Sequence, residues 1–388
     1  MTTSQSGLFA QIGFGDETTP GNDVAPTYAL PFTDESLDAK PARIDGDEII
    51  SGRAGEDSSQ WAPGLVTVGG DTKHVLYPTG IRKHLDAMFG PPSSTSGSGP
   101  YVDTYTPVAG NLGGHAKTVQ KGVPGVGGVI SPVTLSGCKC ASWAIGFKAG
   151  EKVTHAITWV GMKAQIGSRV TAAGVTTSGS PNISDTGAAF TNADVDKLVS
   201  GSITGIPAGT YIKSVTDPTH AVMTANATAT TSSNAFTIGR PLAAATFPSP
   251  LPSAYTFLQS TVSANGQTVK VKEGTLAGDN GLAVDRDFCG QRWIDEPLEA
   301  STRKYTGTIT MEFTDLAQQT LFFAGTEFAL VVTFTQGANS ISFTYNIRYD
   351  GDLSKIADKG IVQQPMSWTA IGAGSDASML TVVNTTAS

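Results

Sequence analysis

The sequence of 388 residues is poor in charge, in cysteine and in long apolar segments. Charged residues make up 15% of it, and the formal net charge is −8. No cluster of Lys and Arg occurs along the chain. Because proteins that grip nucleic acid need such clusters to neutralise phosphates, the composition argues against a DNA-gripping role.

The chain also lacks the marks of a secreted or membrane-anchored protein. No apolar run approaches the ~20 residues that a membrane helix needs. The opening "MTTSQSGLFAQ" has neither the basic start nor the apolar core of a signal peptide. Three cysteines are present, at 138, 140 and 289. We therefore expect folding in the cytoplasm with reduced thiols and no membrane anchor.

Signatures of catalysis or of metal binding are missing. Cys138 and Cys140 are one residue apart, whereas zinc sites favour two to four intervening residues and need two further ligands. Two buried thiols on one strand face are the simpler interpretation, and His155 fits a packed histidine. The acidic turn Asp45–Glu48 lacks the rest of a calcium loop. With no H-E-x-x-H, G-x-S-x-G or P-loop pattern, we expect no enzyme, no cofactor and no metal.

What the chain does contain is typical of short strands joined by tight turns. Glycine contributes 45 residues, and Thr, Ser and Val are abundant. The stretch "SGCKCASWAIGFKAGEKVTHAITWVG" illustrates the pattern. Large apolar residues alternate with small or polar ones over 143–148 and again over 153–159, on either side of Ala149–Gly150. This period of two around a glycine turn predicts a β-hairpin with one apolar face.

Two parts of the chain follow the same order of predicted elements: an acidic strand and turn, a strand, a short helix ending in Gly, a hairpin, and a Trp-containing strand. "GLVTV…IRKHLDAMFG" parallels "GTITMEFTDLAQQTLFFAG", and "ITWVGMKA" parallels "MSWTAIGA". In the first helix Ile81, Leu85 and Met88 fall on one face. Although identity is low, the pattern favours a duplication.

Composition divides the chain into three predicted units. Residues 1–165 comprise an extended N-terminal arm, reaching to about Pro26, and a first β-domain. Residues 168–240 are rich in Ala, Thr, Ser and Gly and predict a small, separate β-module. Residues 245–388 form a second β-domain. The predicted fold class is mainly β: sandwich domains with short flanking helices.

Six segments carry a resemblance to a known family. They are "RIDGDEIISGR…WAPG", "LSGCKCASWAI", "GDNGLAVDR", "RKYTGTITMEF", "GTEFALVVTF" and "IVQQPMSW". In this order they resemble major tail tube proteins of long, flexible-tailed bacteriophages, most closely those infecting actinobacteria. The resemblance covers about 1–165 and 245–388. The middle module is similar to Ala/Thr-rich insertions of other phage structural proteins.

The resemblance implies β-sandwich tube domains that self-assemble into stacked six-fold rings in the virion tail, enclosing a conduit for genome ejection. It implies a tape measure protein, a tail terminator and distal tail proteins as partners, and DNA that passes without specific binding. With a duplication, three chains supply six units; without one, six chains do. The chain is longer than most relatives with one tube domain, which favours the trimer. The module would hang outside the tube, since an insertion of this size would block the lumen.

An acidic lumen would repel phosphate over the ~8 Å that a charge reaches at physiological salt. The acidic residues of the two predicted strand and turn regions are therefore the lumen-facing candidates: Asp38, Asp45, Asp47, Glu48, Asp279 and Asp285. Two other classes of function remain open. One is a virion adhesin that binds carbohydrate through the module, and the other is a β-rich hydrolase of phage origin.

Overall fold

The computed structural model describes residues 6–46, 55, 60–97, 101–107, 112–201, 204–244, 246–248, 253–351, 361–375 and 378–386. Over these residues the protein is mainly β, as predicted, with two short α-helices. Neither helix has the length and apolar character needed to cross a bilayer.

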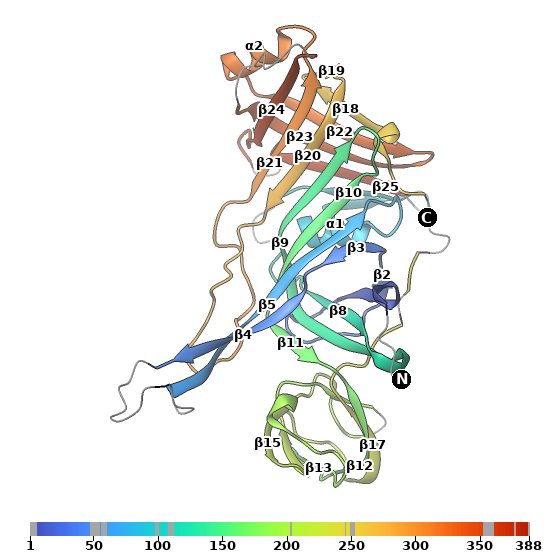
Figure 1. Cartoon of the computed structure of the whole chain (residues 1–388), viewed down its shortest axis with the longest axis vertical. Helices are drawn as coiled ribbons and strands as arrows, with labels where there is room; N and C mark the ends of the chain where they lie inside the picture. Colours follow the sequence, from blue (N-terminus) through green and yellow to red (C-terminus); the bar gives the residue numbers. More distant parts are fainter. Residues whose placement is uncertain are drawn as a thin grey trace.

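We refer to residues 7–166 as the N-half, 169–238 as the module and 256–386 as the C-half. The C-half and the module lie at opposite ends of the elongated molecule, and the N-half lies between them (Figure 1).

The N-half contains twelve of the described elements that form its sheets and its helix. They are β1 (Gln11–Asp16), β2 (Tyr28–Ala29), β3 (Phe32–Glu35), β4 (Asp38–Asp45), β5 (Trp61–Val75), α1 (Arg82–Phe89), β6 (Ser94–Ser96), β7 (Tyr101–Tyr105), β8 (Lys117–Pro124), β9 (Ile130–Lys148), β10 (Thr154–Gly161) and β11 (Lys163–Ile166). Short 3-10 turns stand at η1 (Gly7–Phe9) and η3 (Val126–Gly128).

The C-half begins with the turn η5 (Phe257–Gln259). Its further elements are β18 (Ser260–Ala264), β19 (Gln267–Thr268), β20 (Val271–Asp279), β21 (Lys304–Glu312), α2 (Ala317–Ala324), β22 (Phe328–Gln336), β23 (Asn339–Tyr349), β24 (Gln363–Ala370) and β25 (Leu380–Thr386).

The module has a sheet and an apolar core of its own. Ile183, Phe190, Ile212, Phe236 and Ile238 belong to that core. Its elements are β12 (Arg169–Thr176), β13 (Asn182–Ser184), η4 (Asn192–Asp194), β14 (Val199–Ser200), β15 (Ile212–Asp217), β16 (His220–Met223) and β17 (Thr231–Ile238).

The two halves repeat one order of strand pairing. In the N-half the order across the sheets is β4, β5, β10, β9, β8 and β1. In the C-half it is β20, β21, β24, β23, β22 and β18. The helix follows β5 in one half and β21 in the other, and β11 and β25 pair with the first parts of β9 and β23. The tandem architecture expected from the parallel sequence patterns is therefore present.

The predicted hairpin and the first helix are confirmed. β9 and β10 are antiparallel, with Ile145 opposite His155 and Trp143 opposite Ile157. Ile81, at the start of α1, and the α1 residues Leu85 and Met88 are all buried, and the helix ends at Gly90. Gly90 has a φ of 85°, which glycine adopts without steric cost.

The predicted N-terminal arm is wrong from Gln11 onward. Residues Gln11–Asp16 form β1, which pairs with β8, and Ile12 and Phe14 are buried in the core. The two intervening glycines made this segment look coreless. Their missing side chains instead let Val24 and Pro26 pack directly on the strand, since a Cβ at Gly15 or Gly13 would lie within 2.8 Å of them.

Three histidines meet in the core of the N-half. His74, His84 and His155 come from β5, α1 and β10, and all three are buried. Nδ1 of His84 lies 2.8 Å from Nε2 of His155, and Nδ1 of His74 lies 3.0 Å from the carbonyl oxygen of Pro31. Because an apolar setting disfavours the charged imidazole, burial lowers the pKa of His74 to about 4. Burial also lowers the pKa values of His84 and His155 well below the usual 6.5.

This cluster predicts a loss of stability in weak acid. Below pH 6.5 the unfolded chain binds protons at these histidines while the folded chain does not, so the free energy of unfolding falls as the pH drops toward 4. Each histidine contributes a slope of at most about 1.4 kcal/mol per pH unit, reached where the unfolded imidazole is fully protonated and the folded one is still neutral. Urea denaturation between pH 7.5 and 4 measures the slope. Burial raises the pKa of Glu17 to about 6, which acts in the opposite direction between about pH 6 and 4.5.

The slope is therefore compared between variants. His74→Phe should reduce it, because one buried titrating group is removed. His115→Gln, at an exposed position, should leave it unchanged. Equal slopes for His74→Phe and the parent protein would contradict the prediction.

Candidate assembly surfaces

The two halves share one sheet. The outer edge of β9 is taken by β20 of the C-half, with Ser142–Lys148 paired to 273–279. A second joint pairs β25 of the C-half with β7 of the N-half. Figure 1 shows β10, β9, β20 and β21 running side by side across the boundary. The backbone N–H and C=O groups at one strand edge of each half thus pair with a strand of the other half rather than with water.

Glycine allows the close approach at the first joint. Gly278 of β20 lies beneath the indole of Trp143, and a Cβ there would come within 2.4 Å of the ring. Gly274 has the same relation to the ring of Phe147, again at 2.4 Å. The glycines of the segment "EGTLAGD" therefore lie where the aromatic side chains of β9 pack across β20.

The loop between β20 and β21 extends back over the N-half. The side-chain amide of Asn280 donates to the carbonyl oxygens of Met88 and Cys140, at 3.0 and 2.9 Å. Lys139, whose side chain is fully buried, forms an ion pair with Glu296 of the loop. The backbone N–H of Val66 donates to the carbonyl oxygen of Arg292. Burying Lys139 without this partner would be costly, so the loop is part of the joint.

The solvent side of the shared sheet, which we call the open face, carries small side chains. Alternation along each strand and the register of the pairs place the following residues on it: Ser142, Ala144, Thr154, Ala156, Thr158, Thr275, Ala277, Thr306, Thr308 and Ser367. Charged residues also stand on this face: Asp71 and Lys73 of β5 lie opposite Thr158 and Ala156, and the hydroxyl of Thr158 donates to Asp71.

The acidic residues singled out from sequence fall in different places. Asp38 lies on the open face of β4, and Asp279 lies at the end of β20 opposite Lys304. Asp45 lies farther along β4, beyond a bulge, and pairs with Arg43. Asp285 is exposed in the loop between β20 and β21. Asp47 and Glu48 lie outside the described residues.

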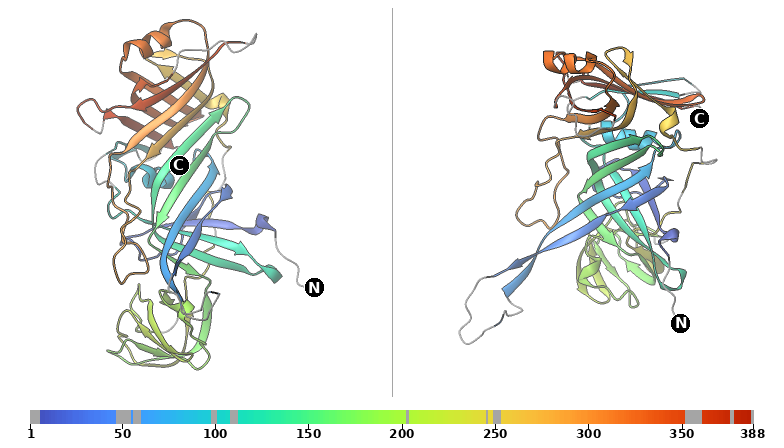
Figure 2. Two further views of the ribbon diagram at one scale, coloured as in Figure 1. Left: turned by 60° about the vertical axis from the view of Figure 1, so that its left-hand side comes forward. Right: turned by 45° about the horizontal axis from the view of Figure 1, so that its top comes forward.

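The outer edge of β4 differs from that of its counterpart β20. Across the described residues, no strand pairs with it besides β5. Together β4 and β5 form an arm that projects from the body of the molecule (Figure 2). Ile44 and Trp61 on this arm are 59% and 50% exposed. An extended edge with exposed apolar side chains is a site for pairing with another chain.

Two contacts reveal which residues of β4 face outward. The hydroxyl of Thr67 on β5 donates to the carbonyl oxygen of Lys40, so the backbone of Lys40 faces β5. In an antiparallel strand successive residues direct their backbone groups to opposite edges. Ala39 therefore faces outward, and its N–H donates to the carboxylate of its neighbour Asp38 at 2.8 Å.

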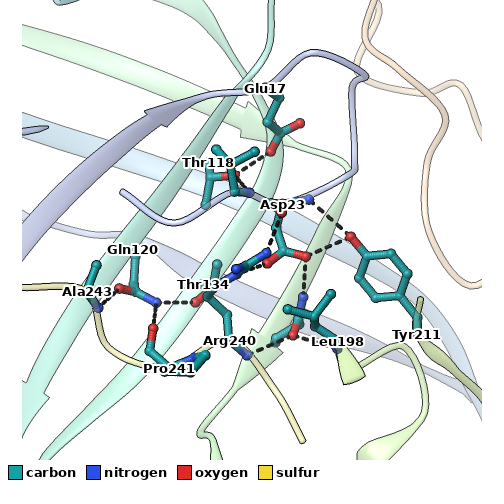
Figure 3. Close-up of polar contacts among 12 residues, drawn as sticks. Glu17, Asp23, Thr118, Gln120, Thr134, Leu198, Tyr211, Arg240, Pro241 and Ala243 are labelled. Atoms are coloured by element: carbon teal, nitrogen blue, oxygen red, sulfur yellow. Dashed lines mark hydrogen bonds and ion pairs between the residues drawn. The ribbon is translucent and has the colours of Figure 1, made fainter. Parts of the chain in front are cut away.

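A polar network ties the module to the N-half (Figure 3). Asp23, which follows β1, is buried and accepts from the side-chain amide of Gln165, at 2.9 Å, and the hydroxyl of Tyr211, at 2.7 Å. Arg240 forms an ion pair with it. The carbonyl oxygen of the Gln165 side chain accepts from the N–H of Leu198. The sequence carries no local signal for this network, because its members are as far as 217 residues apart.

The residues weighed above as metal ligands, Cys138, Cys140 and His155, are buried within the fold. Cys138 and Cys140 are both buried, and burial raises the pKa values of both thiols. Within the described part of the chain, His, Cys, Asp and Glu side chains form no group of three or more that suits a metal ion. The histidine cluster lies in the closed core of the N-half.

These features describe a structural protein made of two tandem β-halves, with strand edges suited to association. The sequence matches the model of the phage tail tube protein family over residues 7–206 and 214–370, which is most of its length. The chain therefore belongs to that family and is a structural component of a phage tail. No curated protein matches it.

The network at the module predicts a large effect of Arg240→Met. This change leaves the buried carboxylate of Asp23 without its cation, which should cost about 3–5 kcal/mol in the free energy of unfolding. The exposed pair of Arg348 and Asp350 provides the matched control. Arg348→Met should cost less than about 1 kcal/mol. Urea denaturation followed by circular dichroism compares the two, and equal losses would count against a structural role of the network.

Proposed function

We propose that this chain is the subunit of the tail tube wall and that three copies close one ring of six repeats. The observation that carries the proposal is the joint of β9 with β20. That joint connects two repeats edge to edge inside one chain, and the same kind of edge is left open at β4. Repeating the joint between chains extends the sheet until it closes on itself.

In this proposal the domains follow the predicted divisions, 1–165, 168–240 and 245–388, with the first and last forming the tube. The open face lines the lumen. Its small Thr, Ser and Ala side chains give DNA a smooth wall without clustered cations to hold phosphates. Asp38, Asp45 and Asp279 contribute negative charge to that wall, and Asp285 extends it along the loop between β20 and β21. Asp47 and Glu48 remain lumen-facing candidates from the sequence.

Rings then stack into a hollow conduit through which the genome leaves the virion. The chain performs no catalysis and needs no cofactor. The tape measure protein inside the tube, the tail terminator and the distal tail proteins at its ends are the proposed partners. Assembly takes place in the host cytoplasm, and the host is proposed to be an actinobacterium from the sequence resemblance. The module lies on the outside of the tube, because the polar network around Asp23 holds it beyond β11 at the end of the molecule.

Purified protein tests the proposal directly. Negative-stain microscopy should show uniform rings or tubes, and mass photometry should give rings of three times the chain mass. Rings of six chains would overturn the trimer, and a discrete oligomer that binds host cells would support an adhesin instead.

The free edge of β4 gives a more specific prediction. Ala39→Pro removes an outward N–H while keeping the ladder to β5, so it should abolish ring formation and leave the chain folded. Ala39→Gly keeps that N–H without adding side-chain volume and should assemble normally. Size-exclusion chromatography with light scattering measures assembly, and circular dichroism measures folding. Rings formed by a folded Ala39→Pro variant would rule out pairing at this edge.

A further inference from the structure

The two helices occupy the same place in their halves but differ in exposure. Within α1 the residues His84, Leu85, Ala87, Met88 and Phe89 are buried. In α2 no residue is buried, and Phe323 is 87% exposed. Leu316, just before α2, is 63% exposed. An apolar helix face of this kind indicates a missing partner.

The contacts that cover the end of α1 identify the contacts that α2 lacks. Each helix ends at a glycine, Gly90 or Gly325, so Phe323 is the counterpart of Met88. The carbonyl oxygen of Met88 accepts from Asn280, which directly follows β20 of the neighbouring half. The end of α1 therefore lies against the base of the β20 and β21 pair.

The strand register identifies the equivalent place beside β4. Gly70 lies opposite Trp159, as Gly307 lies opposite Trp368. Three residues earlier, Thr67 pairs with Lys40 and Lys304 pairs with Asp279. Lys40 is thus the counterpart of Asp279, and the next residue, Pro41, is the counterpart of Asn280.

A groove exists at that place. It has a volume of about 920 Å³ and runs beneath the arm, between β4, β5, β11, the loop before β21 and residues 192–197 of the module. Its lining is largely apolar and includes Ala39, Pro41, Ile44, Val66, Ile166 and Trp293. Asn280 has no counterpart side chain to offer a hydrogen bond here, because Pro41 is apolar. The apolar lining of the groove therefore suits an apolar side chain better than it suits a backbone carbonyl group.

We propose that α2 of one chain docks in this groove of a second copy, with Phe323 inserted beneath the arm beside Pro41 and Ile44. The inference rests on the proposed ring, because it takes the contact between halves inside one chain as the template for the contact between chains. It adds the contact surface between neighbouring chains. The end of α2 of one chain lies in the groove of the next chain, beside the strand pairing at the edge of β4. Burial of Phe323 removes apolar surface from water on both partners.

Cysteine cross-linking tests the contact. The parent variant carries Cys289→Ser, which removes the exposed native thiol, while Cys138 and Cys140 are buried. Adding Phe323→Cys and Ile44→Cys should give disulfide-linked dimers and trimers under mild oxidation. Leu258→Cys with Ile44→Cys is the matched control, since Leu258 is 76% exposed but lies outside the proposed contact. The control should give no disulfide-linked dimers or trimers.

The outcomes separate the two proposals. Rings that form in the Cys289→Ser parent without cross-linking of the paired cysteines, or with equal cross-linking in the control, overturn the docking of α2 and leave the ring intact. A parent that forms no rings overturns the ring itself.

A second variant does not depend on disulfide geometry. Phe323→Asp should abolish ring formation and leave circular dichroism unchanged, because this side chain contributes little to its own core. Val170→Asp, at a module position that is 72% exposed, should leave assembly unchanged. Normal rings from Phe323→Asp would contradict the proposal.

Discussion

The structure depends on how this chain satisfies the backbone groups at its strand edges. An unpaired edge presents a row of N–H and C=O groups that readily pair with another chain. At the centre of the molecule β9 has no such edge, because β10 takes one side and β20 takes the other. At β4 the corresponding outer edge is paired with no strand of the described chain. One molecule thus contains both the closed and the open form of the same kind of joint.

The closed joint is fixed by side chains as well as by backbone pairing. Trp143 and Phe147 pack onto Gly278 and Gly274, where no larger residue fits. Lys139 and Glu296 add an ion pair that is stable only while the loop covers it. These contacts hold the two halves in one relative orientation. A fixed orientation between repeats is what a closing ring requires, since an interface with variable rotation does not close.

Local patterns made several features predictable. Alternation around Ala149–Gly150 predicted the hairpin of β9 and β10, and the spacing of Ile81, Leu85 and Met88 predicted α1. The low charge and the many glycines predicted a mainly β fold, and the repeated order of elements predicted the tandem halves. The prediction failed at β1, where Ile12 and Phe14 are separated by glycines. Period-two alternation was present there, but the small residues concealed a strand that is buried on both sides.

Other features depend on contacts between distant residues. His84 and His155 are 71 residues apart, and Asp23 and Arg240 are 217 residues apart, so no window of sequence connects them. The acidic candidates illustrate the same limit. Sequence placed Asp279 and Asp285 together, whereas the end of β20 leaves the first on the sheet and the second in a loop.

Local sequence patterns were enough to predict the class of fold, the tandem order of the strands and the family, because hydrophobic period and turn residues act over a few neighbours. Which edges meet, which helix is covered and where a groove lies open became visible only in the folded chain. Those properties arise from pairing between strands more than a hundred residues apart, such as β9 with β20, and the register of that pairing is set by side-chain packing across the sheet.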